Sequence, residues 1–142
     1  MEPEKIRVVL DTNIIASAAI SADGNPAKVF GLLLAGGIQN YTTEEIITEI
    51  EDVMERNFFR MHIDEEFRKF ILENYRKNSI IIEPKFSEKI VEKDIKDDKF
   101  VNCALSAKAD IISGDRHLLE LKSYKGIKIL TAREFVERLK SE

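Results

Sequence analysis

Short apolar runs alternate along this chain with stretches whose apolar residues recur at helical spacing. The runs rich in β-branched and aliphatic residues, which predict strands, cover residues 6–10, 38–41, 79–82, 109–113 and 127–130. The first run is nearly continuous, as in a parallel strand that is covered on both faces. Strands separated by helices imply a three-layer α/β/α fold with a central parallel sheet.

The helical segments have recognisable starts and stops. Helices are expected after residue 11, between the turn residues 23–26 and the glycine pair 36–37, and in a hairpin formed by two helices, one capped by Thr42 or Thr43 and one beginning at Asp64. The first hairpin helix buries one face, made of Ile46, Ile47, Ile50, Val53 and Met54, and the second runs through Phe67, Phe70, Ile71 and Tyr75.

The C-terminal half continues the same alternation. A weak helical turn is expected around Ile90, a helix over 97–108, a short helix through Leu118 and Leu119, and a closing helix capped by Thr131 with Phe135, Val136 and Leu139 on its inner face. A chain of 142 residues with 44% hydrophobic content is long enough for one core and short for two, so residues 1–142 are expected to form a single domain.

Charge and cysteine content narrow the class of protein. A net charge of -4 argues against a broad basic face that coats nucleic acid, although bound divalent ions can reverse the local charge where a phosphate lies. One cysteine, Cys103, cannot form an internal disulfide, and no run of about 18 apolar residues could span a membrane. The polar start is unlike a signal peptide, so a cytoplasmic location is expected.

Two aspartates follow predicted strands directly. Asp11 ends the first strand and Asp115 follows the fourth, and ligands of open parallel sheets bind beyond the carboxyl ends of the strands. If these strands flank a topological switch, both side chains lie in one crevice. The competing interpretation is that each aspartate only caps the next helix.

The position of Asp97 is stronger evidence for a functional role. Phe100, Val101 and Ala104 follow it at helical spacing, so Asp97 lies on the apolar stripe of its helix. A carboxylate on the buried stripe is costly unless it is compensated, and a metal ion is one such partner. Asp94 and Asp98 point off this stripe and are expected to be solvated. The alternative is that the Asp97 side chain bends back into solvent and interacts only with the dipole at the helix N-terminus.

Glu49 has no obvious structural role on its helix. The spacing Thr42-x-x-Glu45 matches a capping box and assigns Glu45 to the helix start. Glu49 lies one turn further on, at the border of the apolar face, and can reach inward. Most glutamates at such borders are merely solvated.

Four segments together resemble the PIN-domain family. They are Val-Val-Leu-Asp-Thr-Asn at 8–13, Thr-Glu-Glu-Ile-Ile-Thr-Glu at 43–49, Asp-x-x-Asp-x-x-Phe at 94–100 and Ala-Asp-Ile-Ile-Ser-Gly-Asp at 109–115. The resemblance covers nearly the whole chain, and the last segment is the most specific. It is closest to the branch of toxin components of toxin-antitoxin pairs.

The resemblance implies a doubly wound domain of about five parallel strands whose acidic residues bind Mg2+ or Mn2+ and cleave RNA. It places Asp11, Glu49, Asp97 and Asp115 at the family's four acidic positions. Asn13 and Ser113 take accessory polar positions, and Asp94 also has a counterpart, so either Asp94 or Asp97 is the leading ligand; the apolar stripe favours Asp97. The toxin branch further implies an antitoxin partner and a homodimer.

The chemistry of these residue types is consistent with that inference. Clustered carboxylates raise one another's pKa values unless a cation lies among them, and hard oxygen ligands favour Mg2+ or Mn2+ over Zn2+. Asp11 and Asp97 are expected to be principal ligands, Asp115 a ligand or water-orienting group, and Glu49 a second-metal or outer ligand. Three cations beside the predicted site could contact RNA phosphates: Lys99, Arg116 and His117. For each of them, ordinary surface charge is the favoured interpretation.

Other residues receive no catalytic role. Cys103 is assigned to packing, and His62 is placed in a loop between helices without a role. The apolar group Phe58, Phe59 and Met61 is core or interface, and the helices from Thr43 to Tyr75 are candidate contact surfaces.

Two other functions also suit an α/β sheet with aspartates at its strand ends. A metal-dependent phosphatase would resemble enzymes that need Asp-x-Asp after the first strand, whereas Asp11 is followed by Thr12 and Asn13. A non-catalytic RNA- or protein-binding module of the same fold is disfavoured because all four acidic positions are filled.

Overall fold

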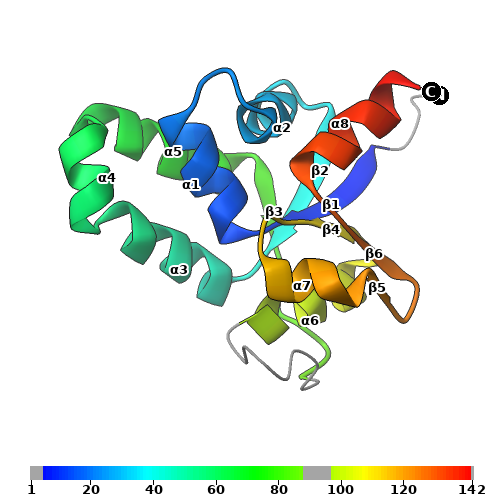
Figure 1. The fold of residues 1–142 in the computed structure, drawn as a ribbon. Coiled ribbons are helices and arrows are strands. Elements are labelled where there is room, and N and C mark those ends of the chain that lie inside the picture. Colours follow the sequence, from blue (N-terminus) through cyan, green and yellow to red (C-terminus); the bar gives the residue numbers. More distant parts are fainter. Residues whose placement is uncertain (1–4, 88–96, 142) are drawn as a thin grey trace.

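The strands assemble into one six-stranded sheet in a computed structural model that describes residues 5–87 and 97–141 (Figure 1). The strand order is β3-β2-β1-β4-β6-β5. The strands are β1 (Ile6–Leu10), β2 (Ile38–Thr42), β3 (Ser79–Ile81), β4 (Asp110–Ile112), β5 (Ser123–Tyr124) and β6 (Ile127–Leu130). Neighbours pair in parallel throughout, except that β5 is antiparallel to β6.

The sheet extends from β1 in two opposite directions. The chain first adds β2 and β3 on one side, and it later adds β4 and β6 on the other. Such a reversal creates a crevice between the loops that follow the two central strands. The predicted parallel sheet is therefore confirmed, and its switch point lies between β1 and β4.

The short strand β5 was not predicted. It has only two residues and returns to β6 through Lys125 and Gly126, which have φ values of 46° and 86°. A two-residue strand is too short to carry a periodic hydrophobic signal, and the glycine supplies the left-handed backbone that this tight turn needs.

Helices cover both faces of the sheet, as the α/β/α prediction required. One layer contains α1 (Thr12–Ile20), α2 (Asn25–Leu34) and α8 (Ala132–Lys140), and the other contains α6 (Asp98–Ala107) and α7 (Arg116–Leu121) (Figure 1). Helix α6 packs on β1, β2 and β4, which places its first residues beside the switch point. In the described part of the chain, no helix has the length and apolar character to cross a bilayer.

An arm of three helices extends to one side of the sheet (Figure 1). It consists of α3 (Glu44–Met54), α4 (Asn57–His62) and α5 (Glu65–Lys77). The sequence predicted only two of them, because α4 buries no residue and so shows no apolar periodicity. The prediction of a loop at His62 is wrong: this residue ends α4, and its ring stacks on Phe58.

Thr43, not Thr42, caps α3. The Thr43 hydroxyl accepts a hydrogen bond from the Ile46 N–H, whereas Thr42 is the last residue of β2 and accepts one from the Tyr75 hydroxyl at 2.8 Å. The Thr42-Glu45 capping box is therefore wrong. The predicted buried face of α3 is confirmed at all five positions.

The inner face of α5 also differs from the prediction. Phe67 and Phe70 are 45% and 46% exposed, while Arg68 is buried and donates hydrogen bonds to the carbonyls of Ile63 and Met54. Because Arg68 can satisfy these buried carbonyls, it takes the place that an apolar residue was expected to fill. Phe58 and Met61 of α4 are exposed as well, so they are not core residues.

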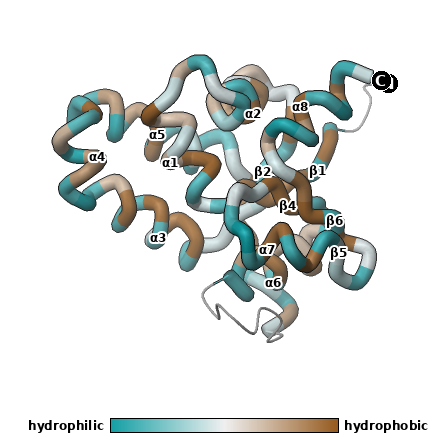
Figure 2. Tube along the Cα trace, in the orientation of Figure 1, coloured by the Kyte–Doolittle hydropathy of each residue, from teal (hydrophilic) through white to brown (hydrophobic). Residues whose placement is uncertain are grey.

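The core lies between the sheet and the two helical layers. The central strand β4 is strongly hydrophobic in Figure 2, and the side chains of the central strands at Val8, Val9, Leu10, Ile111 and Ile112 are fully buried. Cys103 is also fully buried, which confirms its assignment to packing, and burial raises the pKa of its thiol to about 12.

Candidate active site

The switch point between β1 and β4 brings Asp11 and Asp115 to the same edge of the sheet. The Asp11 N–H donates to the Ile112 carbonyl at 3.0 Å, which continues the β1–β4 pairing to the first aspartate. Asp115 follows three residues after the end of β4. The two aspartates therefore lie at one edge of the sheet, as the sequence predicted.

Ser113 links the two aspartates. Its hydroxyl donates a hydrogen bond of 2.5 Å to Asp11 Oδ2 and accepts one from the Asp115 N–H at 2.9 Å. Ser113 is fully buried, and its own N–H is bonded to the Leu130 carbonyl of the next strand. The serine therefore fixes the relative position of the first and fourth acidic residues.

Asp11 is a buried acid surrounded by other acids. Its side chain is 4% exposed, and burial raises its pKa from 3.8 to about 6. The negative charges of Asp115 and Glu49 raise this pKa further, while the hydrogen bonds from Ser113 and from the Asn13 backbone lower it. A carboxylate in such a setting is stabilised in its charged form by a nearby cation.

Asp97 enters the site from the start of α6. It is the N-cap residue of that helix and is 6% exposed, and its Oδ2 atom is fully buried. The predicted burial of Asp97 is confirmed. Asp98, expected to be solvated, is only 7% exposed, so that expectation is wrong. Asp94 lies outside the described residues.

Asp115 has two roles at once. Its Oδ1 atom accepts hydrogen bonds from the N–H groups of His117 at 2.7 Å and of Leu118 at 3.3 Å, so it caps α7. Capping and ligand binding were competing interpretations of this residue. The two are compatible, because these bonds engage Oδ1 and leave Oδ2 for other interactions.

Asp97, Asp115 and His117 come together at the same place. One ligand atom from each lies within 4.8 Å of the others. Two carboxylates and an imidazole form a donor set that fits a divalent cation. The sequence assigned His117 to ordinary surface charge, although its position two residues after a strand-end aspartate could have indicated the site.

Glu49 is held at the edge of this cluster from two sides. The Thr12 hydroxyl donates a hydrogen bond to its Oε2, and the Lys99 ammonium lies 2.8 Å from its Oε1. The Lys99 side chain is only 9% exposed, so its interpretation as surface charge is wrong. Arg116 is 81% exposed and pairs with Glu120, as expected of a surface residue.

A family profile described as PIN domain matches residues 7–117 of the sequence. This chain belongs to the PIN-domain family. The match contains Asp11, Glu49, Asp97 and Asp115. Proteins with PIN domains are generally nucleases, so this PIN domain is placed among hydrolases by its family.

Relatives and solved structures agree with the assignment of the fold. The chain is 35% identical over 146 residues to Uncharacterized protein MJ1680 of Methanocaldococcus jannaschii, covering 96% of this chain and 94% of that protein. Its fold is similar to the crystal structure of PAE2754 from Pyrobaculum aerophilum, with a TM-score of 0.65, 14% identity and coverage of 96% and 91% of the two chains.

A second solved structure shows the same fold. VapBC2 from Rickettsia felis, bound to a DNA fragment from their promoter, matches with a TM-score of 0.59 and 14% identity, over 89% of this PIN domain and 98% of that chain. At this identity the likeness concerns the fold alone.

A groove adjoins the acidic cluster of this PIN domain. It encloses about 310 Å³, and its lining includes Asn13, Ser113, Gly114 and Arg133. The Asn13 amide oxygen accepts a hydrogen bond from the Gly114 N–H at 3.1 Å, which fixes the accessory residue Asn13 to the loop after β4. The groove therefore reaches the acidic cluster through Ser113, which is bonded to Asp11, and it offers polar atoms and the guanidinium of Arg133, which is paired with Glu137.

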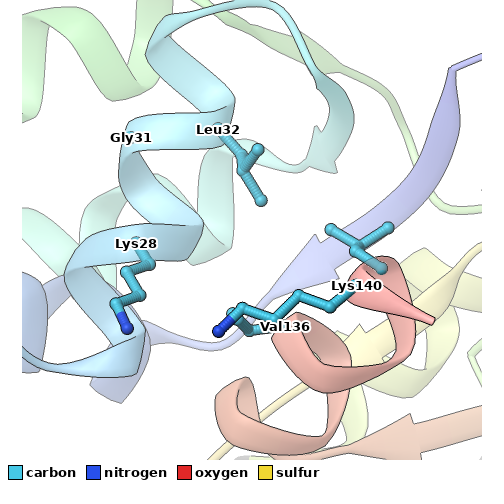
Figure 3. A pocket seen from close by; sticks show the side chains of 6 residues that line it. Lys28, Gly31, Leu32, Val136 and Lys140 are labelled. Carbon is cyan, nitrogen blue, oxygen red and sulfur yellow. The ribbon is translucent and has the colours of Figure 1, made fainter. Parts of the chain in front are cut away.

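Another groove lies between α2 and α8 (Figure 3). It encloses about 420 Å³ and is lined by Lys28, Gly31, Leu32, Val136, Leu139 and Lys140. No carboxylate lines it, so it cannot serve as the acidic site.

Proposed function

We propose that this PIN domain is a divalent-metal-dependent endoribonuclease that cleaves single-stranded RNA, and that Asp11, Glu49, Asp97 and Asp115 form its active site. The observation that carries the proposal is the position of Asp11. This buried carboxylate is bonded to Ser113 and lies near the negative charges of Asp115 and Glu49 at the carboxyl edge of a parallel sheet. A cation offsets the cost of assembling these charges.

The residues divide into ligands and positioning groups. Asp11, Asp97 and Asp115 would hold Mg2+ or Mn2+, and Glu49 would contribute an outer ligand or bind a second ion. When bound, such an ion supplies an activated water and stabilises charge on the phosphate. Ser113 and Asn13 keep the loop after β4 in place through their hydrogen bonds.

The groove at Asn13 and Arg133 supports a single-stranded nucleic acid as substrate. Its lining residue Ser113 is bonded to Asp11, and the groove offers hydrogen-bond donors and a guanidinium to a phosphate-sugar chain. With a net charge of -4, the protein lacks the excess of cations that favours extensive contact with a duplex. A few local contacts are therefore proposed to hold the strand.

The biological setting is also part of the proposal. The resemblance to the toxin branch supports a toxin role with an antitoxin partner, in a single cytoplasmic domain. Exposed apolar side chains of the arm support a homodimer contact through α4 and α5: Phe58, Met61, Phe67 and Phe70.

The proposal is tested by incubating the purified full chain with a mixed single-stranded RNA pool in EDTA, Mg2+ or Mn2+. We expect cleavage only with metal, and we expect Asp11→Asn and Asp97→Asn to remove it. Asp52→Asn, which changes an exposed carboxylate on α3, is the matched control and should cleave like the wild type.

The same assay separates the alternatives. Metal binding without RNA cleavage, but with hydrolysis of phosphomonoesters, would establish a phosphatase instead. RNA binding that is equal in EDTA and in metal, without any cleavage, would establish a binding module. Cleavage that persists in EDTA or in both aspartate variants would show that the acidic site is not responsible.

A further inference from the structure

We propose that the imidazole of His117 is a nitrogen ligand of the metal site and that it makes the site prefer Mn2+ over Mg2+. This inference rests on the proposed function, which requires a divalent ion at the acidic cluster, and it adds the identity of one ligand and the selectivity that follows. It starts from the convergence of Asp97, Asp115 and His117, whose ligand atoms lie within 4.8 Å of one another.

The start of α7 directs His117 toward the cluster. The His117 N–H donates to Asp115 Oδ1 at 2.7 Å, so the backbone that carries the imidazole is fixed to the aspartate beside it. His117 is half-buried, whereas the preceding residue, Arg116, extends into solvent and pairs with Glu120. The helix start therefore presents the histidine and not the arginine to the carboxylates.

The three side chains come from two segments that pack on or are bonded to the central strands. Asp97 begins α6, which packs on β1, β2 and β4. Asp115 is tied through Ser113 to Asp11 at the end of β1. Because both segments are anchored to the central strands, a cation bound here would meet donors whose positions are already set.

A nitrogen donor changes which ion is bound best. Mg2+ strongly prefers oxygen ligands and sheds its waters reluctantly. Imidazole is a nitrogen ligand that suits transition-metal ions. The affinity of such a site for divalent ions of the first transition row rises from Mn2+ onward. A site of carboxylates alone would discriminate less between Mg2+ and Mn2+ than a site that adds His117.

The test is pulsed electron paramagnetic resonance on Mn2+ bound to the full chain. Coordination by an imidazole produces nitrogen modulation in the Mn2+ signal, and labelling the protein with ¹⁵N-histidine changes that modulation without any substitution. We expect modulation in the wild type and in His62→Gln, and its loss in His117→Gln. His62, exposed at the end of α4, is the matched control.

Affinity gives a second readout. We expect His117→Gln to weaken Mn2+ binding by about tenfold or more, since even partners of metal ligands contribute about that much affinity, and to weaken Mg2+ binding less, so that the Mn2+ over Mg2+ preference measured by displacement of Mn2+ with Mg2+ falls. Thermal unfolding in EDTA compares the folding of the two variants without metal. The isotope experiment on the wild type does not depend on either variant.

The outcomes distinguish this inference from the proposed function. Mn2+ binding that needs Asp97 but shows no nitrogen modulation, or modulation that persists in His117→Gln, overturns the histidine ligand and leaves the nuclease standing. An unchanged Mn2+ preference in His117→Gln overturns the selectivity. Absence of Mn2+ binding to the wild type overturns both.

Discussion

The Lys99 ammonium lies 2.8 Å from Glu49 Oε1, although the two residues are far apart in the sequence. Lys99 also lies 4.9 Å from the centre of the Phe100 ring, and the second Glu49 oxygen accepts a hydrogen bond from Thr12. A nearly buried cation thus fixes one of the four acidic side chains and offsets part of the negative charge of the site.

Replacing Lys99 should impair cleavage through Glu49. We expect Lys99→Met to slow RNA cleavage by about tenfold to a hundredfold, as loss of a residue that orients a metal ligand does. Because both residues act as one unit, the double variant with Glu49→Gln should be no slower than the slower single variant. Cleavage rates of the three variants at saturating Mn2+ provide the measurement.

The matched control is Lys69→Met, which removes an exposed ion pair with Glu65 and should leave the rate unchanged. Losses that multiply in the double variant would show that Lys99 acts independently of Glu49, for example on the RNA.

Asp11 should make the metal-free protein less stable as the pH rises. Burial raises its pKa from 3.8 to about 6, so the folded state keeps a proton that the unfolded chain has already released. The folded state binds more protons between about pH 4 and pH 6, and the free energy of unfolding therefore falls through that window. Above it, Asp11→Asn should be more stable than the wild type by up to ~3 kcal/mol.

Urea unfolding in EDTA at several pH values measures this effect. Asp52→Asn, at an exposed position, should follow the wild type. If Asp11→Asn loses stability with pH as steeply as the wild type, the buried acid is not the origin of the dependence.

Removing the Ser113 hydroxyl should raise the pKa of Asp11 above about 6, because the hydrogen bond from Ser113 stabilises the charged carboxylate. Carbon NMR titration of labelled aspartate in Ser113→Ala, without metal, reports that pKa directly. Ser106→Ala removes a hydroxyl that bonds the Asn102 carbonyl elsewhere and serves as the control. An unchanged or lower pKa in Ser113→Ala would contradict the proposed bond.

Asn40 should be required for stability although it is none of the proposed catalytic residues. It is fully buried, accepts a hydrogen bond from the Leu10 N–H at 2.9 Å and donates one to Ser79 Oγ at 2.9 Å. Asn40→Ala leaves a buried N–H unsatisfied and opens a cavity, so we expect a loss of about 2 to 4 kcal/mol.

Chemical unfolding of Asn40→Ala in EDTA tests this at neutral pH. The exposed Asn57, at the start of α4, provides the control substitution Asn57→Ala. A loss below about 0.5 kcal/mol, typical of surface positions, would mean that water or a neighbouring group satisfies Leu10.

Hydrophobic patterns among residues close in the sequence were sufficient to predict much of the fold. The apolar runs predicted the parallel strands, and the stripe at Phe100 and Val101 predicted the burial of Asp97. Strand-end aspartates and the switch point are consequences of these local patterns together with the rules of parallel sheets. Local periodicity suffices for these elements because each of them buries one face, whatever its partners are.

Tertiary structure decided which polar residues share the site. The burial of Asp98 and Lys99, the contact of Lys99 with Glu49, and the approach of His117 to Asp97 all depend on how α3, α6 and α7 pack around the sheet. Short elements such as α4 and β5 were also missed, since they bury too little to leave a pattern. The sequence by itself determined the elements and the strand-end acids. The environment of each charge depended on residues brought together from distant segments, because desolvation and ion pairing act through space and not along the chain.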